Sequence, residues 1–249
     1  MRTDSLKFGI EIEGFVPGTG DFLPVQGGYH AGIEIDGFPA GWNCQRDASV
    51  SDGPVGYIGL EIVSPPLRGE DGLVQVVAVC DYLLSVGFVT NKKCGLHVHI
   101  DGRQLDSVAI TRLVESFKVM EGFFYSLNGS ETATRYQSNY TKPVSRWITP
   151  DGFSDRYQSL NLQNWLQSAR SLKRTVEFRC FASTVDAIQV VAVIHMCAGL
   201  VALAHDGIAP EVTPHGILSQ LRNPDYRIVP DAEIWDIALH MAHQYEKAA

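Results

Sequence analysis

The chain has 249 residues, a formal net charge of −8 at pH 7 and 45% hydrophobic residues. This length allows one large domain or two small ones, and the hydrophobic fraction excludes wholesale disorder. Acidic residues outnumber basic ones by 28 to 20, which argues against nonspecific binding to nucleic acids or anionic membranes, because both need a basic surface. The five cysteines are scattered, and the N-terminus lacks the apolar core of a signal peptide. Both observations predict a cytoplasmic protein with free thiols.

The first half of the chain predicts strands and helices in alternation. Glycine, proline and aspartate before Tyr57 favour turns, and the helical spacing of apolar residues after Asp71 ends at Gly87. In chain order, the predicted elements are a strand over 6–15, turns and short strands over 16–56, a strand over 57–64, a helix over 71–86, a strand over 94–101 and a helix over 107–127.

The second half is predicted to combine two loop regions, a strand pair and two helices. The apolar run from Val190 to Ala204 is interrupted by His195, which favours a buried helix over a membrane span. The predicted elements are a loop over 129–156, a strand pair over 157–162 and 175–181, a helix over 186–205, a proline-rich loop over 208–230 and an amphipathic helix over 231–247. We therefore expect an α+β catalytic domain over 1–207 with a helical extension over 208–249 packed on it.

Three of the predicted strands alternate polar and apolar residues. Side chains of a strand switch faces at every residue, so the polar members of each strand share one face. These members are Glu11 and Glu13 in the first strand, His97, His99 and Asp101 in the strand over 94–101, and Glu177 and Arg179 in the last. The pattern predicts a sheet with one polar, ion-binding face.

Glu61 adds a fourth glutamate that could point to the same place. Two carboxylates 4 Å apart repel by about 4 kcal/mol at an effective dielectric near 20, so such a cluster must take up protons or cations. Oxygen-rich sites suit Mg²⁺ or Mn²⁺, and an imidazole joins more readily with Mn²⁺. Phosphate is the usual further ligand of Mg²⁺, and Arg179 would then neutralise a phosphoryl or carboxylate oxygen.

Each pair also has a simpler interpretation when it is taken alone. The three alternatives are a solvated edge strand for Glu11 and Glu13, a structural zinc half-site or solvent-facing pair for His97 and His99, and a cross-strand salt bridge for Glu177 and Arg179. Solvated faces use lysine, threonine and serine as readily as glutamate and histidine. The three pairs together therefore favour an ion-binding site.

Five segments in this order resemble the amidoligase family, carboxylate–amine ligases related to glutamine synthetase and glutamate–cysteine ligase. They are FGIEIEG at 8–14, DAS at 47–49, GLEIVSP at 59–65, CGLHVHID at 94–101 and VEFR at 176–179. The resemblance implies a curved, mainly antiparallel sheet with helices on its outer face, like the catalytic domain of glutamine synthetase. It also implies ATP, Mg²⁺ ions and an amide bond formed through an acyl phosphate.

The resemblance further implies a role for individual residues. It implies metal binding by Glu11, Glu13, Glu61, His97 and Glu177, contacts to nucleotide phosphate by His97, His99, Arg179 and Ser49, catalysis by Glu177 and Arg179, and substrate contacts by Asp47 and Asn161. The catalytic base for the amine would be Asp47 or Glu11, and Arg135 is a candidate substrate contact because its loop is expected beside an anionic site. The expected partners are a small-molecule or peptide carboxylate and an amine, with no nucleic acid and no membrane.

A second class of enzyme fits the same residues. A carboxylate–histidine face can also activate water, which describes a divalent-metal hydrolase that needs no nucleotide. The chain has no GxxxxGK[ST] motif, so ATP use follows from the resemblance alone. A binding module without chemistry is a third interpretation, which an uncompensated acidic cluster disfavours.

Overall fold

The computed structural model describes residues 3–18, 32–127, 138–144, 155–167, 174–226, 228 and 232–248. Its centre is one sheet with the strand order β2-β3-β1-β5-β7-β6, in which β4 also pairs with β1. All of these strand pairs are antiparallel. The strands are β1 (Lys7–Pro17), β2 (Asn43–Gln45), β3 (Tyr57–Val63), β4 (Leu67–Arg68), β5 (Gly95–Asp101), β6 (Leu160–Asn161) and β7 (Thr175–Ala182).

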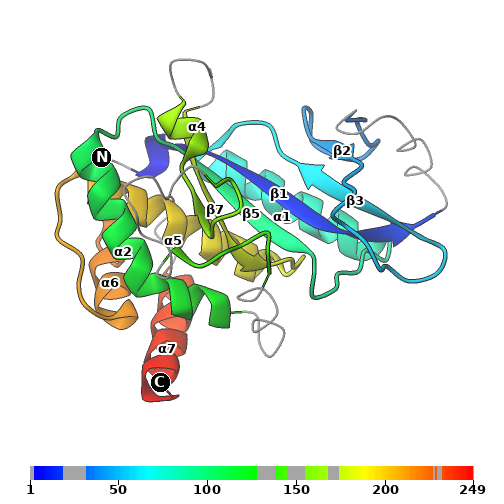
Figure 1. Cartoon of the computed structure of the whole chain (residues 1–249). Helices are drawn as coiled ribbons and strands as arrows, with labels where there is room; N and C mark the ends of the chain where they lie inside the picture. The colour runs from blue at the N-terminus through cyan, green and yellow to red at the C-terminus, as the bar shows by residue number, and fades with distance from the viewer. Residues whose placement is uncertain are drawn as a thin grey trace.

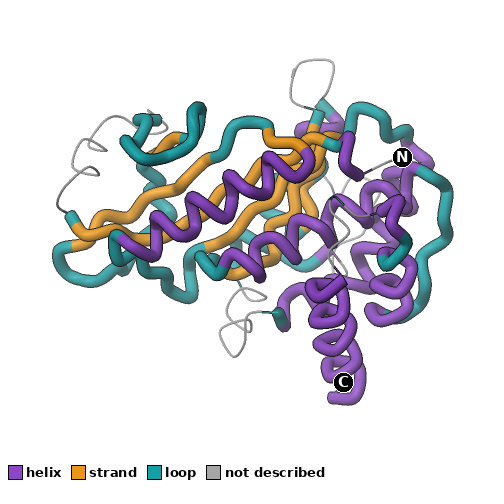
Figure 2. Tube along the Cα trace, turned by 180° about the vertical axis from the view of Figure 1, so that it is seen from behind, coloured by secondary structure: helices purple, strands orange, loops and turns teal. Residues whose placement is uncertain are grey.

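Helices cover one face of this sheet. Figure 1 shows β1, β5 and β7 in front of α1 and α5, and Figure 2 shows these two helices from behind, lying over the sheet. The helices of the described residues are α1 (Gly69–Ser85), α2 (Ser107–Ser126), α4 (Gln163–Leu166), α5 (Ala187–His205), α6 (Pro214–Leu221) and α7 (Ala232–Ala248), with short 3₁₀ helices η1 (Thr3–Ser5) and η6 (Pro224–Tyr226). This arrangement confirms the predicted α+β class.

The alternation in the strands explains why the sheet has two different faces. In β5, Leu96, Val98 and Ile100 are fully buried, and Ile10 and Ile12 of β1 join them in the main hydrophobic core. These side chains pack toward the helices, and the intervening polar residues therefore project from the opposite face. The predicted separation into an apolar and a polar face is confirmed.

The most apolar helix is α5, and it belongs to the core. It is long and apolar enough to cross a membrane, with a mean hydropathy of 2.2, but 78% of that stretch is buried inside the protein. It packs against α1, α2 and β5, and Asp186 caps its first turn by accepting from Ile188 N and Gln189 N. The predicted buried helix is confirmed, as are the five free, buried cysteines.

The predicted loop over 208–230 is wrong, because α6 and η6 lie within it. Pro214 occupies the start of α6, where the missing N–H costs no hydrogen bond, and Thr213 caps the helix by accepting from Gly216 N. Proline therefore begins a helix here. The strand predicted over 157–162 is shorter than expected, since β6 has only Leu160 and Asn161.

Candidate active site

The sheet register brings the predicted polar residues together from five strands. β1 is central, with β3 on one side and β5 on the other, so the solvated edge strand considered for Glu11 and Glu13 is wrong. Backbone pairing sets the residues of the polar face opposite one another. The pairs are Glu13 with Glu61, Glu11 with His97, His99 with Glu177, and Glu177 with Asn161.

His97 lies between two groups of carboxylates. Its Nδ1 is 3.0 Å from Glu11 Oε2 and 3.9 Å from Glu177 Oε1, whereas its Nε2 is 3.8 Å from Glu13 Oε1. Two triads result, Glu11–His97–Glu177 and Glu13–Glu61–His97, each with ligand atoms within 4.8 Å of one another. Each triad could hold one metal ion, and to bind both ions at once the shared imidazole would use both ring nitrogens and give up its N–H proton.

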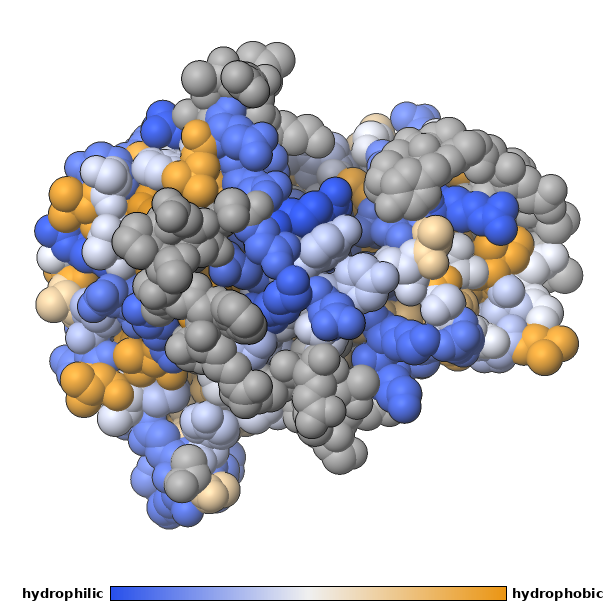
Figure 3. Space-filling view, in the orientation of Figure 1, coloured by the Kyte–Doolittle hydropathy of each residue, from blue (hydrophilic) through white to orange (hydrophobic). Residues whose placement is uncertain are grey.

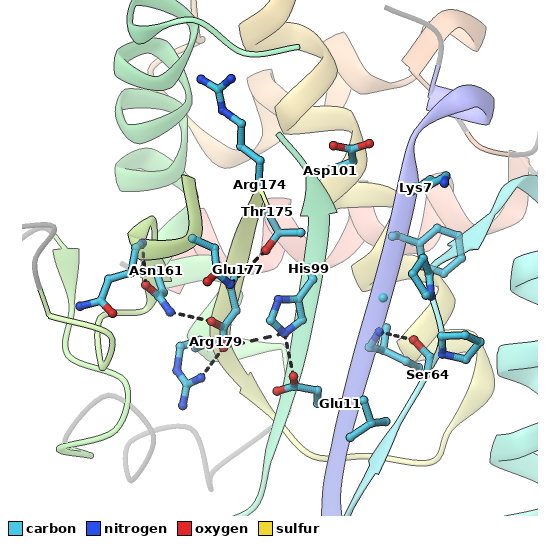
Figure 4. Close-up of a pocket in the computed structure, with 18 of the residues that line it drawn as sticks. Lys7, Glu11, Ser64, His99, Asp101, Asn161, Arg174, Thr175, Glu177 and Arg179 are labelled. Atoms are coloured by element: carbon cyan, nitrogen blue, oxygen red, sulfur yellow. Dashed lines mark hydrogen bonds and ion pairs between the residues drawn. The ribbon is translucent and has the colours of Figure 1, made fainter. Parts of the chain in front are cut away.

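The second histidine and the arginine close the first triad (Figure 4). His99 Nε2 lies 3.1 Å from Glu11 Oε1 and 4.0 Å from Glu177 Oε1. Arg179 forms an ion pair through Nη1 with Glu177 Oε1, and Asn161 Nδ2 donates to Glu177 Oε2 at 2.6 Å. Glu177 thus pairs with Arg179 within one strand, not across strands as the simpler interpretation held, and the pair is part of a larger cluster.

The charges of the first triad stabilise one another. Burial disfavours the ionised form of Glu11, but His99 and His97 outweigh it and hold the Glu11 pKa well below its usual value. Burial also opposes ionisation of Glu177, yet His99 and Arg179 lower its pKa. Burial would lower the pKa of His99, but Glu11 and Glu177 raise it to about 9. Without metal, Glu11, Glu177 and His99 therefore carry their charges at neutral pH.

Glu61 behaves differently because burial and the neighbouring acidic groups dominate its electrostatic environment. Burial, followed by Glu11, Glu13 and Asp47, raises the Glu61 pKa to about 9. This carboxyl is 6% exposed, and at neutral pH it holds a proton in the metal-free protein. A divalent cation in the second triad would replace that proton.

Protonation of Glu61 predicts that the stability of the metal-free protein depends on pH. The Glu61 pKa is higher in the folded protein than in the unfolded chain. The contribution of the Glu61 proton to folding stability is therefore fully present below about pH 4.5 and is lost progressively as the pH rises to about 9. In metal-free protein, Glu61→Gln should match the wild-type melting temperature near pH 5 and exceed it near pH 8 by about 8–16 °C, which corresponds to about 4 kcal/mol. Scanning calorimetry in chelator tests this. An equal difference at both pH values would contradict a protonated Glu61.

The remaining predicted residues lie at different distances from this cluster. Asp47 is close enough to Glu61 to raise its pKa, and its Oδ1 accepts from Ser49 N at 2.6 Å. Both precede β3 in a turn on the Glu61 side of the cluster. Arg135 lies outside the described residues.

A cavity of about 590 Å³ opens beside the first triad. Glu11, His99, Asn161, Glu177 and Arg179 line one end of it. Figure 3 shows that hydrophilic residues gather over the middle of this face of the molecule. The volume is within the usual range for a small-ligand pocket.

Further basic residues also line this cavity, which the sequence interpretation missed. Its basic lining residues are Lys7, Arg103, Arg156 and Arg174, of which Arg103 is paired with Asp101. Lys7 could have been found, since it has the same strand parity as Glu11. Arg156 and Arg174 flank β6 and β7, and no periodicity in those connecting segments indicates their direction.

The fold and the site define a class: an open antiparallel sheet whose polar face carries two carboxylate–histidine triads beside a cavity with several basic lining residues. Residues 40–150 match a protein-family model described as "Putative amidoligase enzyme". This match confirms the resemblance to amidoligases that the sequence motifs indicate, and it supports a carboxylate–amine ligase. It includes Glu61, His97 and His99, whereas Glu11 and Glu177 lie outside the matched residues.

Solved structures with a similar fold are distant in sequence. One is a chain in the crystal structure of the complex between the prokaryotic ubiquitin-like protein Pup and its ligase PafA, with 12% identity and a TM-score of 0.47, covering 99% of this chain and 59% of that one. Another is a novel glutamine synthase homolog, with 13% identity and a TM-score of 0.46, covering 98% of this chain and 67% of that one. No curated protein matches the chain.

Proposed function

We propose that this protein is an ATP-dependent carboxylate–amine ligase that forms an amide through an acyl phosphate in the cytoplasm. The observation that carries the proposal is the pair of triads sharing His97, with Arg179 and a cavity next to them. The family match over residues 40–150 supports the same class of reaction.

The donor set fits divalent cations. All ligand atoms are carboxylate oxygens or imidazole nitrogens, which Mg²⁺ and Mn²⁺ accept. Glu11, His97 and Glu177 would hold one ion, and Glu13, Glu61 and His97 a second. When bound, such ions supply positive charge that offsets the crowding of ATP against a carboxylate and against four glutamates.

The protein's own cations act on the nucleotide. Lys7, Arg156 and Arg174, which line the cavity, would attract its phosphates. Arg179, which burial and ion pairing hold next to Glu177, would neutralise charge that develops on the transferred phosphoryl group. His99 carries positive charge at neutral pH in the metal-free site and would contact the same phosphates.

The reaction has two transfers. A carboxylate oxygen of the acid attacks the γ-phosphorus and ADP leaves; the amine then attacks the acyl carbon, and phosphate leaves with the electron pair of the broken C–O bond. Asp47, beside Glu61, would take the proton that the amine loses. Asn161 and Arg135 would contact the small-molecule or peptide substrates, and Ser49 the nucleotide.

Hydroxylamine tests the proposal directly. Purified protein with Mg²⁺, ATP and a panel of carboxylic acids, glutamate and peptide acids included, should release ADP and convert the activated acid into a hydroxamate. In a parallel thermal-shift titration, a nonhydrolysable ATP analogue with Mg²⁺ should raise the melting temperature beyond Mg²⁺ alone. A response to metal only, without ADP release, would favour the nucleotide-independent hydrolase.

A further inference from the structure

A buried carboxylate outside the cluster has no place in the chemistry described so far. Glu121 lies on α2 and is 2% exposed. Its Oε1 accepts from Val144 N at 2.7 Å and from Ser159 Oγ at 2.5 Å. A carboxylate is costly to bury unless hydrogen bonds satisfy it, and here both donors belong to segments that lead to the active site.

The first connection runs through Ser159 to the backbone of β7. While the Ser159 hydroxyl donates to Glu121, the Ser159 carbonyl accepts from Arg179 N at 2.7 Å. Two residues further on, Asn161 holds Glu177 through the bond to Oε2. The same short stretch of chain therefore contacts Glu121 at one side and both members of the Glu177–Arg179 pair at the other.

The second connection reaches the Arg179 side chain. Val144, held by Glu121, ends the described segment over 138–144. Tyr125, one helical turn after Glu121, anchors the same segment by donating to Thr141 O at 2.5 Å. Next to that anchor, the Tyr140 carbonyl accepts from Arg179 Nε at 3.4 Å. Because α2 fixes the segment at two points, the carbonyl that faces the guanidinium cannot shift freely.

We propose that Glu121 is a positioning residue for Arg179, acting through Ser159 on its backbone and through the 138–144 segment on its guanidinium. This inference rests on the proposed ligase function, in which Arg179 meets the transferred phosphoryl group. A misplacement of about 1 Å can cost about 10²-fold in rate. Loss of the Glu121 anchor should therefore lower kcat and leave the KM for ATP and acid nearly unchanged.

The test compares two substitutions at one position. Glu121→Met keeps the shape and removes the acceptor, and it should lower kcat by about 10²-fold. Glu121→Gln keeps an oxygen for Val144 N and Ser159 Oγ, and it should stay within about fivefold of wild type. Ser116→Ala, a buried polar site on the same helix whose hydroxyl bonds to Arg112 O, is the matched control and should leave turnover unchanged.

Two further measurements separate positioning from general stability. In an Arg179→Ala background, Glu121→Met should cause no additional loss of turnover, because the residue through which it acts is gone. Tyr125→Phe, which removes the second anchor, should lower kcat in the same way if Glu121→Met fails to fold. An equal loss in both backgrounds would overturn the proposal.

Hydrogen exchange gives a readout that does not depend on ligase activity. The Arg179 amide should exchange at least about tenfold faster in Glu121→Met than in wild type at equal melting temperature, while amides of β3 keep their protection. Unchanged exchange at Arg179 would overturn the positioning role even if the protein proves inactive as a ligase. Faster exchange with no ligase activity in wild type would reject the proposed function alone.

Discussion

Glu177→Gln is expected to lower ligase turnover by about 10³-fold, because metal ions supply several kcal/mol of transition-state stabilisation and each 1.36 kcal/mol is about tenfold in rate. The substitution keeps the shape of the side chain but removes the charge that faces His97, His99 and Arg179. Few other residues touch as many members of the cluster, since Glu177 also accepts from Asn161. ADP release and hydroxamate formation measure the loss.

The fold should survive this substitution. Glu177→Gln leaves the apolar face of β7 intact, so circular dichroism should match wild type and the metal-free melting temperature should stay within about 5 °C. Glu115→Gln removes one carboxylate from an exposed position on α2 and should keep wild-type turnover. Wild-type turnover in Glu177→Gln would show that the cluster is not the active site.

The polar face could be predicted because strand parity is local. Alternation along each strand sorts Glu11 and Glu13, or His97 and His99, onto one side without any knowledge of neighbours. The apolar residues between them fix which side faces the helices. Strand parity does not determine the order of the strands in the sheet. The sequence interpretation therefore left open whether Glu11 and Glu13 lie on an edge strand.

A bulge in the β5–β7 pair shows where parity fails. Leu96 pairs with Phe181 and Val98 with Phe178, so β7 has one more residue than β5 across this stretch. Phe178 and Phe181 consequently both reach α2, where they contact Phe117 and Phe124, although they have opposite parity. An extra residue in one strand carries no compositional signal, because it depends on a partner strand far away in the chain.

The Glu121 connection was also beyond the reach of sequence patterns. On α2, Glu121 follows Met120 and precedes two buried phenylalanines, and a single acidic residue in such a run has no periodic partner. Its partners, Val144 and Ser159, lie 23 and 38 positions further along the chain, in segments with little regular structure. Their approach depends on how α2 packs against β7, which is a tertiary property.

His97→Ala should remove both proposed metal sites in a single substitution. His97 contributes to both triads found among the described residues, whereas Glu11 and Glu13 each contribute to one. Titration calorimetry with Mn²⁺ should give two sites for wild type, one for Glu13→Gln and none of comparable affinity for His97→Ala. Turnover should fall by at least about 10³-fold in His97→Ala.

The number of Mn²⁺ ions bound tests whether both triads share the His97 imidazole more directly than the loss of ligase turnover does. A histidine that served only as a structural member of the core would lower stability in His97→Ala but leave two Mn²⁺ sites. His243→Ala, at an exposed position on α7, should bind Mn²⁺ as wild type does. If His97→Ala retains one full site, the imidazole belongs to a single triad, and the remaining site then identifies which carboxylates bind metal without it.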